Sequence, residues 1–166
     1  PVLYICNVAE EDATTGNKYS KLVQDIANKE NALSIIISAK IESEISQLNN
    51  EEKNEYLTAL GLKASGLEQV IQSGYKLLDL ITYFTSGPEE SRAWTISKGS
   101  NAPRAAREIH TDFEKGFIRA EVVSYKDYVT FQGDKKSKEA GKMRVEGKDY
   151  IVEDGDVIYF RFNVWF

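Results

Sequence analysis

The spacing of apolar residues changes once along this 166-residue chain, near residue 80, and this change restricts the possible folds more than any other feature. Before it, short apolar runs alternate with segments whose apolar residues recur every three or four positions, the pattern of strands followed by helices. After it, apolar and polar positions alternate over short stretches, which is typical of half-buried strands. We therefore expect two domains of different architecture, at 1–80 and 81–164.

The first part is expected to form a parallel α/β domain. Two continuous apolar runs predict buried strands, and the apolar positions after the first run, such as Tyr19, Leu22 and Ile26, have helical spacing. Strands separated by helices favour a parallel sheet with crossover connections. The expected elements are strand 2–6, helix 18–29, strand 34–37, helix 41–48, and two further helices, one from Asn50 and one at 66–78.

The second part is expected to consist mainly of strands. Alternating segments predict a hairpin around Gly87 and Pro88 and a second hairpin that closes the domain. This order of elements is that of the β-grasp (ubiquitin-like) fold, in which two strands are followed by a helix and then by further strands, the last of them apolar. The expected elements are strands 81–85 and 91–96, a short helix after Pro103, strand 117–123, a mobile loop or fraying helix at 135–142, and strands 150–152 and 157–164.

Composition limits the class of protein. With 42% hydrophobic residues, the chain can bury one good core or two small ones. Its single cysteine, Cys6, cannot form an internal disulfide, which fits a reducing, cytoplasmic location. No apolar run approaches the roughly 20 residues of a membrane span, and no signal peptide is present, so we expect no membrane partner.

Charge is distributed unevenly between the two parts. Residues 1–80 contain 12 acidic and 7 basic side chains, whereas residues 81–166 contain 14 of each. A balanced part rich in lysine and arginine beside an acidic part suggests two domains with different partners. An ordinary solvated surface explains the same distribution.

The ends of the two predicted strands of the first part carry the clearest chemical signal. Asn7 and Glu10 follow the first strand in an Asn-x-x-Glu pattern, and Ser-Ala-Lys occupies 38–40 after the second strand. Parallel sheets bind ligands at the carboxyl ends of their strands, where an Asn amide can reach the edge of a purine. In P-loop GTPases an acid three residues after such an Asn selects guanine, and a Ser-Ala-Lys loop faces the same base. These residues therefore predict a purine-base site.

Two departures from the GTPase pattern weaken the selectivity for guanine. Glu10 is one methylene longer than the usual Asp, and Val8 replaces the usual Lys, whose stem covers one face of the base. Adenine is therefore an open alternative. Taken alone, Asn-x-x-Glu also fits a simple strand-end cap, but the second match after the other strand favours the base site.

Motifs along almost the whole chain resemble those of the YchF / Obg-like ATPase family of P-loop NTPases. They are Asn-Val-Ala-Glu at 7–10, Ser-Ala-Lys-Ile-Glu at 38–42, Thr-Tyr-Phe-Thr-Ser-Gly-Pro at 82–88, Arg-Ala-Trp-Thr-Ile at 92–96, Ile-His-Thr-Asp-Phe-Glu-Lys-Gly-Phe-Ile-Arg-Ala-Glu-Val at 109–122, Glu-Gly-Lys-Asp-Tyr at 146–150 and Gly-Asp-Val-Ile-Tyr-Phe-Arg-Phe-Asn-Val at 155–164. The resemblance implies a GTPase-like domain, an inserted helical arm and a C-terminal TGS domain of β-grasp type. It also implies slow hydrolysis of ATP or GTP with Mg²⁺ and a ribosomal partner.

The resemblance also implies roles for individual residues. Asn7 and Glu10 would flank the base and Val8 would pack on it, while the opposite side would be formed by the loop residues Ser38, Ala39 and Lys40. No catalytic residue is assigned, because the chain has no Gly-x-x-x-x-Gly-Lys-Ser/Thr phosphate loop and no assignable Mg²⁺ ligand.

The missing phosphate loop leads us to expect the C-terminal part of a longer nucleotide-binding protein. This part would be inactive by itself, and ATP or GTP with Mg²⁺ would be held only by the intact protein. Its own contributions would be base recognition and the TGS domain. The last two residues, Trp165 and Phe166, extend past the family's usual end and receive no interpretation.

A basic stretch near the C-terminus suggests contact with RNA. Its cations are Lys135, Lys136, Lys138, Lys142 and Arg144. They follow Tyr125, Tyr128 and Phe131, and basic residues interleaved with aromatic ones suit contact with the RNA backbone and base stacking. Acidic neighbours dilute this patch, and a solvated loop over an aromatic core is the alternative.

Other candidate residues have simpler explanations. His110, the only histidine, suits a structural hydrogen bond better than a role as general base. Asp154 and Asp156 flank Gly155, and a tight turn explains this pair better than Ca²⁺ binding. No Cys/His spacing supports zinc, so no metal site is expected in the chain.

Two classes of function remain open from the sequence. The chain is either part of a nucleotide-hydrolysing switch that acts on the ribosome, or a stand-alone β-grasp module that binds RNA or the ribosome without nucleotide chemistry.

Overall fold

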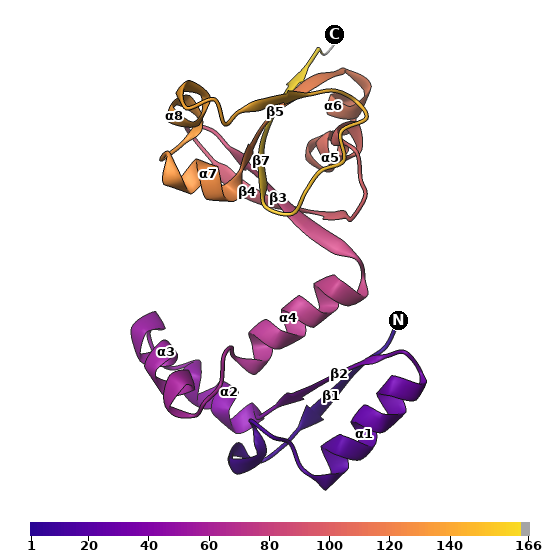
Figure 1. Cartoon of the computed structure of the whole chain (residues 1–166), viewed down its shortest axis with the longest axis vertical. Coiled ribbons are helices and arrows are strands. Elements are labelled where there is room, and N and C mark those ends of the chain that lie inside the picture. The colour runs from indigo at the N-terminus through magenta and orange to yellow at the C-terminus, as the bar shows by residue number, and fades with distance from the viewer. Residues whose placement is uncertain (164–166) are drawn as a thin grey trace. The chain divides into compact units, whose positions relative to one another are not determined.

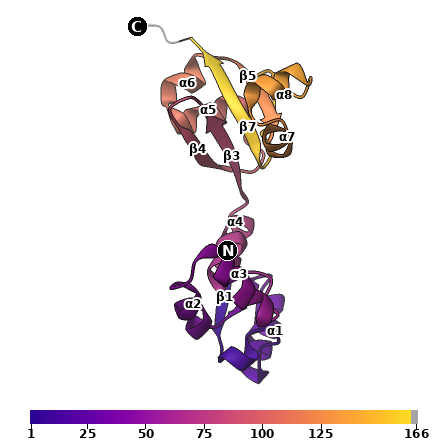
Figure 2. The same cartoon turned by 90° about the vertical axis from the view of Figure 1, so that its left-hand side faces the viewer.

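The computed structural model describes residues 1–163 and divides the chain into two compact units, Pro1–Leu78 and a second unit that begins at Asp79 (Figure 1, Figure 2). The expectations for Val164, Trp165 and Phe166 concern positions outside the described residues. Among the residues that the structure describes, no helix is both long enough and apolar enough to cross a bilayer.

The first unit alternates strands and helices in the predicted order. Side chains just before three of its helices accept hydrogen bonds from the first helical N–H groups, and these N-caps are Asn17, Asn49 and Ser65. The helix predicted at 41–48 begins and ends earlier, and the other boundaries agree closely. The elements are β1 (Leu3–Asn7), the short 3-10 helix η1 (Glu10–Asp12), α1 (Lys18–Lys29), β2 (Leu33–Ile37), α2 (Ala39–Ile45), α3 (Asn50–Ala59) and α4 (Gly66–Leu77).

The two strands of the first unit form a parallel pair, in which Asn7 faces Ile37. α1 and α4 lie on opposite sides of this pair (Figure 1). A Cβ atom at Gly16, before α1, would meet Ile36, whereas one at Gly66, in α4, would meet Ile37. Because successive strand residues point to opposite faces, these contacts place the two helices on the two faces. The predicted parallel pairing is confirmed, and it sets the carboxyl ends of both strands side by side.

The core of the first unit is small. Its buried cluster consists of Ile41, Ile45 and Leu57, whereas Val2 and Ile5 are 51% and 48% exposed. The two strands are therefore less buried than their continuous apolar runs predicted. The physical reason is that each strand has only one neighbour in this two-stranded sheet.

The second unit contains a five-stranded mixed sheet in the order β4-β3-β7-β5-β6. The two central neighbours β3 and β7 are parallel, and the other pairs are antiparallel. The predicted first hairpin and the helix after it are present. The elements are β3 (Leu80–Ser86), β4 (Ser91–Ser97), α5 (Ala102–Ile109), α6 (Thr111–Lys115), β5 (Phe117–Ser124), α7 (Tyr125–Thr130), α8 (Asp134–Glu139), β6 (Arg144–Glu146) and β7 (Asp156–Phe162).

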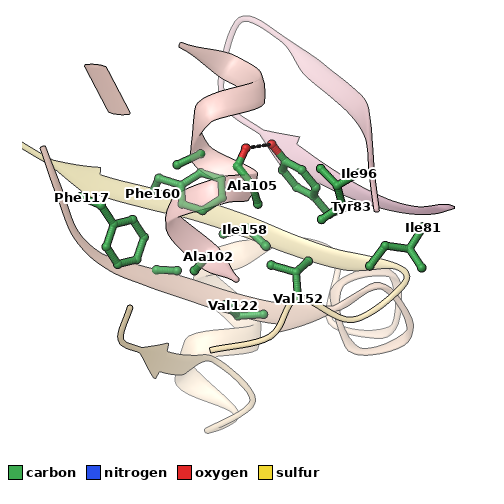
Figure 3. Packing of buried hydrophobic residues seen from close by; sticks show 12 residues of the cluster. Ile81, Tyr83, Ile96, Ala102, Ala105, Phe117, Val122, Val152, Ile158 and Phe160 are labelled. Carbon is green, nitrogen blue, oxygen red and sulfur yellow. Dashed lines mark hydrogen bonds between the residues drawn. The ribbon is translucent and has the colours of Figure 1, made fainter. Parts of the chain in front are cut away.

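The main core lies between this sheet and α5 (Figure 3). Tyr83 is fully buried in it, and its hydroxyl donates a hydrogen bond of 2.8 Å to the carbonyl of Ala105. Burial raises the pKa of the Tyr83 phenol above its ordinary value. The other buried members are Ile81, Ile96, Ala102, Ala106, Phe117, Ala120, Val122, Val152, Ile158 and Phe160.

The predicted closing hairpin is wrong. Ile151 forms an isolated bridge with Asn101, and β7 pairs with β3 and β5 instead of with the segment before it. The strand at the far edge of the sheet is the short β6, within a stretch that the sequence analysis left without regular structure. Helices α6 and α7 were also not expected, whereas α8 matches the predicted fraying helix.

Candidate functional site

The proposed base-binding residues meet at one edge of the first unit. Asn7 is the last residue of β1, and Ser38 directly follows β2. Because the strands are parallel and in register, both segments leave the sheet at the same edge. The Val8 N–H continues the pairing with a hydrogen bond of 2.9 Å to the carbonyl of Ile37. The parallel pairing therefore brings together two motifs that are distant in the sequence.

A direct hydrogen bond joins the two motifs. The backbone N–H of Ala39 donates to Oδ1 of Asn7 at 2.9 Å. This bond fixes the Asn7 amide, with its oxygen toward α2. The same orientation leaves the NH₂ group of Asn7 available to donate to an acceptor on a ligand. Asn7 and Ala39 are both exposed, so a ligand has access to this group.

An ion pair joins the motifs a second time. Nζ of Lys40 lies 2.7 Å from Oε2 of Glu10, with exposed side-chain fractions of 67% and 29%. The hydrogen bond to Glu10 raises the pKa of the Lys40 ammonium. The Glu10 carboxylate is therefore engaged in this structure. Exposed ion pairs contribute little net stability, so a ligand can displace this one.

Ser38 occupies the N-cap position of α2 without capping it. Its hydroxyl makes no hydrogen bond to the helix, and it is a buried polar atom without a partner. Buried hydroxyls usually have a partner, so this group has free hydrogen-bonding capacity beside the candidate site.

A further residue, to which no role was assigned from the sequence, holds the second motif in place. Glu42, in α2, accepts hydrogen bonds from the N–H groups of Gly66 and Leu67 at 2.6 and 3.1 Å. These are the first N–H groups of α4, where a carboxylate is favourable. The sequence does mark this residue, since Glu42 is the last residue of the Ser-Ala-Lys-Ile-Glu motif. Its contact ties α2, and with it the Ser38–Lys40 loop, to α4.

The described residues provide no second half for a nucleotide site. No group of three or more His, Cys, Asp or Glu that could hold a metal ion occurs among them. The residues of the candidate site fit a base, which needs donors, acceptors and an apolar contact. They contain no cluster of N–H groups or lysines arranged around a phosphate chain.

The basic residues of the second unit are less uniform than the sequence suggested. Lys135, Lys136 and Lys138 lie exposed on α8, and Lys142 is exposed after it. Arg144 differs, because its guanidinium donates to Tyr150 at 2.9 Å and lies 3.4 Å from the buried carboxylate of Asp156. Its charge therefore serves an internal ion pair.

The residues set aside in the sequence analysis have structural roles. Asp156 is 2% exposed and accepts hydrogen bonds from the Tyr150 hydroxyl and the Glu153 N–H. Asp154 accepts a hydrogen bond from the Thr82 N–H. Nδ1 of His110 accepts a hydrogen bond from the Asp112 N–H at the start of α6.

The fold therefore defines a class of chain in which a parallel α/β unit precedes a unit with a mixed five-stranded sheet. Within this class, a family model described as "YchF-GTPase_C: Protein of unknown function (DUF933)" matches residues 80–163. This match covers half of the chain, and the chain belongs to the YchF family.

Relatives and solved structures agree with this assignment. The chain is 57% identical over 164 residues to the "Ribosome-binding ATPase YchF" of Haemophilus influenzae and 52% identical over 166 residues to that of Bacillus subtilis. In both comparisons 99% of this chain covers 45% of the relative, so the chain spans less than half the length of these relatives.

Two solved structures have a similar fold. The YchF GTPase of Schizosaccharomyces pombe is 36% identical with a TM-score of 0.83, and the match covers 97% of this chain and 43% of that one. A GTP-binding protein of Pyrococcus horikoshii is 20% identical with a TM-score of 0.67, over 98% of this chain and 46% of that one, which shows a similarity of fold alone.

Proposed function

We propose that this chain is the C-terminal part of a ribosome-associated protein that binds and hydrolyses ATP or GTP as a switch. In this proposal, residues 1–80 are the C-terminal portion of the nucleotide-binding domain and supply base recognition. Two findings support it: the relatives are named ribosome-binding ATPases, and the chain spans 45% of their length. The phosphate loop, the Mg²⁺ ligands and the hydrolytic step would come from residues outside this chain.

The observation that carries the proposal is the hydrogen bond between Asn7 and Ala39. It joins the ends of two neighbouring parallel strands, where α/β domains bind ligands. In the proposed complex, the NH₂ group of Asn7 donates to a ring nitrogen of the purine and Val8 packs on its face. Ser38, Ala39 and Lys40 line the opposite side of the base.

The ion pair between Lys40 and Glu10 favours ATP over GTP in this proposal. Guanine is selected when a carboxylate accepts two N–H groups from one edge of the base. Here Lys40 competes for the same carboxylate at 2.7 Å. Adenine presents one donor and one acceptor at this edge and so needs no free carboxylate. The proposed cofactor is therefore ATP, with GTP as the weaker ligand and Mg²⁺ bound to the phosphates.

For the second unit we propose a TGS domain of β-grasp type, at 81–164, that contacts ribosomal RNA or the ribosome in the cytoplasm. The strand order β4-β3-β7-β5-β6, with parallel central strands and α5 against one face, supports this assignment. The proposed RNA contacts are the exposed lysines Lys135, Lys136, Lys138 and Lys142. Arg144 contributes less, because Asp156 already balances its charge.

Calorimetric titration tests the nucleotide proposal. ATP and GTP are titrated separately into this chain and into a version extended upstream to the length of its relatives. We expect measurable binding only by the longer protein, with a preference for ATP, because most nucleotide affinity comes from phosphate contacts. Binding by neither version would assign the chain to the alternative, a β-grasp RNA- or ribosome-binding module. Turnover by the short chain would contradict the proposal that it is inactive alone.

Charge reversal tests the ribosomal proposal. Lys135→Glu with Lys136→Glu is expected to weaken co-sedimentation of the chain with ribosomes, because both lysines are exposed on α8. The matched control is Lys98→Glu with Lys115→Glu, which makes the same change of charge elsewhere in the second unit. Equal co-sedimentation of both variants would remove α8 from the contact surface.

A further inference from the structure

The second unit has a hollow on the side of its sheet away from α5. The hollow has a volume of about 290 Å³ and lies between the β3–β4 hairpin and α7. Phe84, Ala93 and Val157 form its floor, and Tyr125 and Tyr128 form a wall. Phe84 pairs directly with Val157 and with Ala93 across the sheet, so all three share one face. The interior of the hollow is therefore apolar and aromatic.

The size of the hollow suits one ring system. Its volume of about 290 Å³ lies just below the roughly 300–1,000 Å³ that is usual for small-molecule sites. The ring centroids of Phe84 and Tyr125 lie 5.7 Å apart, and the two ring planes are tilted by 37°. Tyr125 is 56% exposed. One of its surfaces is thus open to a stacking partner.

Hydroxyl groups line the rim of the hollow. The Ser86 hydroxyl lies 3.0 Å from that of Ser91 and 2.8 Å from that of Tyr128. Each hydroxyl can donate one hydrogen bond and accept two, so this chain of hydroxyls can rearrange to meet either a donor or an acceptor. Such a rim accepts the edges of different bases without strict selection among them.

Exposed lysines lie on the α7 and α8 side of the aromatic wall. Lys126 is exposed on α7 beside Tyr125. The guanidinium of Arg92 lies instead 4.2 Å from the centre of the Trp94 ring, on the other face of the sheet. Lys135 and Lys136 are exposed on α8, which starts next to this wall, since a Cβ atom at Gly133 would lie 4.0 Å from the Tyr128 hydroxyl. This arrangement complements the phosphates of a polynucleotide.

Acidic groups near the hollow favour one path for the backbone of a bound polynucleotide over another. Glu89 and Glu90 lie in the loop between Ser86 and Ser91, and Asp127 lies on α7. The carboxylate of Asp127 accepts a hydrogen bond from the Ser124 hydroxyl and is therefore already engaged within α7 and its N-cap. The two glutamates disfavour phosphate at the hairpin end, so the backbone of a polynucleotide is expected to run along the α8 side.

We infer that this hollow binds one unpaired base of single-stranded RNA, stacked on Tyr125, with its phosphates held by Lys135 and Lys136. The inference rests on the proposed RNA contact of the second unit and identifies the group that is bound. A base inside a duplex could not enter, because its faces are covered by its neighbours. The hollow thus predicts a preference for single strands over duplexes.

Binding of fluorescein-labelled RNA to the full chain tests this inference. The probes are a short oligo(U) RNA, the same sugar–phosphate backbone without bases, and an RNA duplex. We expect Tyr125→Ala to weaken oligo(U) binding by roughly 10- to 100-fold, the usual effect of losing a stacked base. The same variant should leave the weak binding of the abasic strand unchanged. Tyr19→Ala, which removes an exposed tyrosine of the first unit, is the matched control and should change nothing.

The outcomes separate this inference from the proposed function. If Tyr125→Ala and Tyr19→Ala bind oligo(U) equally strongly, the base site is overturned, although the proposed contact with RNA still stands. A chain that binds neither RNA nor ribosomes overturns both. Loss of ribosome co-sedimentation by Tyr125→Ala with normal oligo(U) binding would assign the hollow to a protein side chain and overturn the inference.

A cross-link on the unchanged chain avoids any effect of a substitution on folding. RNA that contains 4-thiouridine is bound and irradiated, and the modified peptide is identified by mass spectrometry. We expect attachment at Tyr125 or Tyr128. Attachment only outside α7 and the β3–β4 hairpin would contradict the base site.

Discussion

At the scale of single residues, the two base-site motifs already bind each other. Lys40 occupies the carboxylate of Glu10, and Ala39 occupies the amide oxygen of Asn7. In the proposed base site, the contact with Ala39 would leave the NH₂ group of Asn7 free to donate to the base, whereas Lys40 would compete with the base for Glu10. The identity of the acid at position 10 should therefore influence which purine is preferred.

Glu10→Asp should shift the preference toward GTP. The shorter carboxylate is withdrawn from Lys40 and matches the acid of guanine-selective sites. Hydrogen bonds to a charged group are worth about 1.5–3 kcal/mol, so the ratio of GTP to ATP affinity should rise by roughly tenfold or more. Calorimetry on the upstream-extended protein measures this ratio, with Glu11→Asp as the control. An unchanged ratio would show that Glu10 does not face the base.

Glu121 is expected to influence stability in acid. Arg161 donates two hydrogen bonds to its carboxylate, at 3.2 and 3.1 Å, and these lower the pKa of Glu121 below its ordinary 4.5. A lowered pKa in the folded state adds stability above the unfolded pKa, and this stability is lost as the pH falls through the folded pKa.

Glu121→Gln should therefore be less stable than the original chain at pH 7, and the difference should shrink between about pH 5 and pH 3. Trp94 packs against the core of the second unit, so its fluorescence reports urea unfolding of this unit. Glu89→Gln, at an exposed position, is the control. A pH-independent difference would show that the ion pair with Arg161 contributes nothing to folding.

At the scale of elements, the end of β7 approaches α6 too closely for a side chain. A Cβ atom at Gly116 would overlap the carbonyl oxygen of Asn163, whose own N–H donates to the Gly116 carbonyl at 2.8 Å. The glycine is required here by space, since its φ is −87° and other residues adopt that value freely.

Gly116→Ala is accordingly expected to lower the free energy of unfolding by roughly 1–3 kcal/mol. Gly147→Ala is the matched control, because a Cβ atom at Gly147 meets nothing within 4 Å, and its effect should stay within about 0.5 kcal/mol. Urea unfolding of both variants measures the difference. Equal stabilities would mean that β7 shifts away at no cost.

At the scale of the whole molecule, the two units differ in how much apolar surface they bury. The second unit has an extended buried cluster, whereas the first has three buried aliphatic side chains in its cluster and an exposed apolar strand edge at Ile5. α1 and α4 also expose apolar side chains, namely Tyr19, Leu22, Ile26, Leu67 and Ile71. Buried apolar area is the main source of stability, so the units should differ in stability.

Hydrogen exchange should show this difference directly. Amides of β1 and β2 are expected to exchange roughly tenfold or more faster than those of β5 and β7, because opening of the first unit exposes less apolar surface. Mass spectrometry of peptides from the intact chain measures both sets at once. The amides of the exposed loop at Gly147 serve as an unprotected reference. Equal protection of both sets of strands would contradict the argument from burial.

The sequence by itself determined the features that depend on neighbours along the chain. Helical spacing located α1 and α4, alternation located the β3–β4 hairpin, and the motifs identified the family. The positions of Asn7 and Ser38 at the ends of strands were also predictable, because both residues close or directly follow apolar runs. These signals are local, since periodicity and capping act within a few residues.

Only the tertiary structure decided which distant segments meet. Alternation marked β7 as a strand, but its pairing with β3 and β5 depends on how the whole sheet closes. The ion pairs of Lys40 and Arg144, the capping of α4 by Glu42, and the hollow beside Tyr125 likewise join residues far apart in the sequence. Such contacts depend on distance in space, which local patterns do not encode.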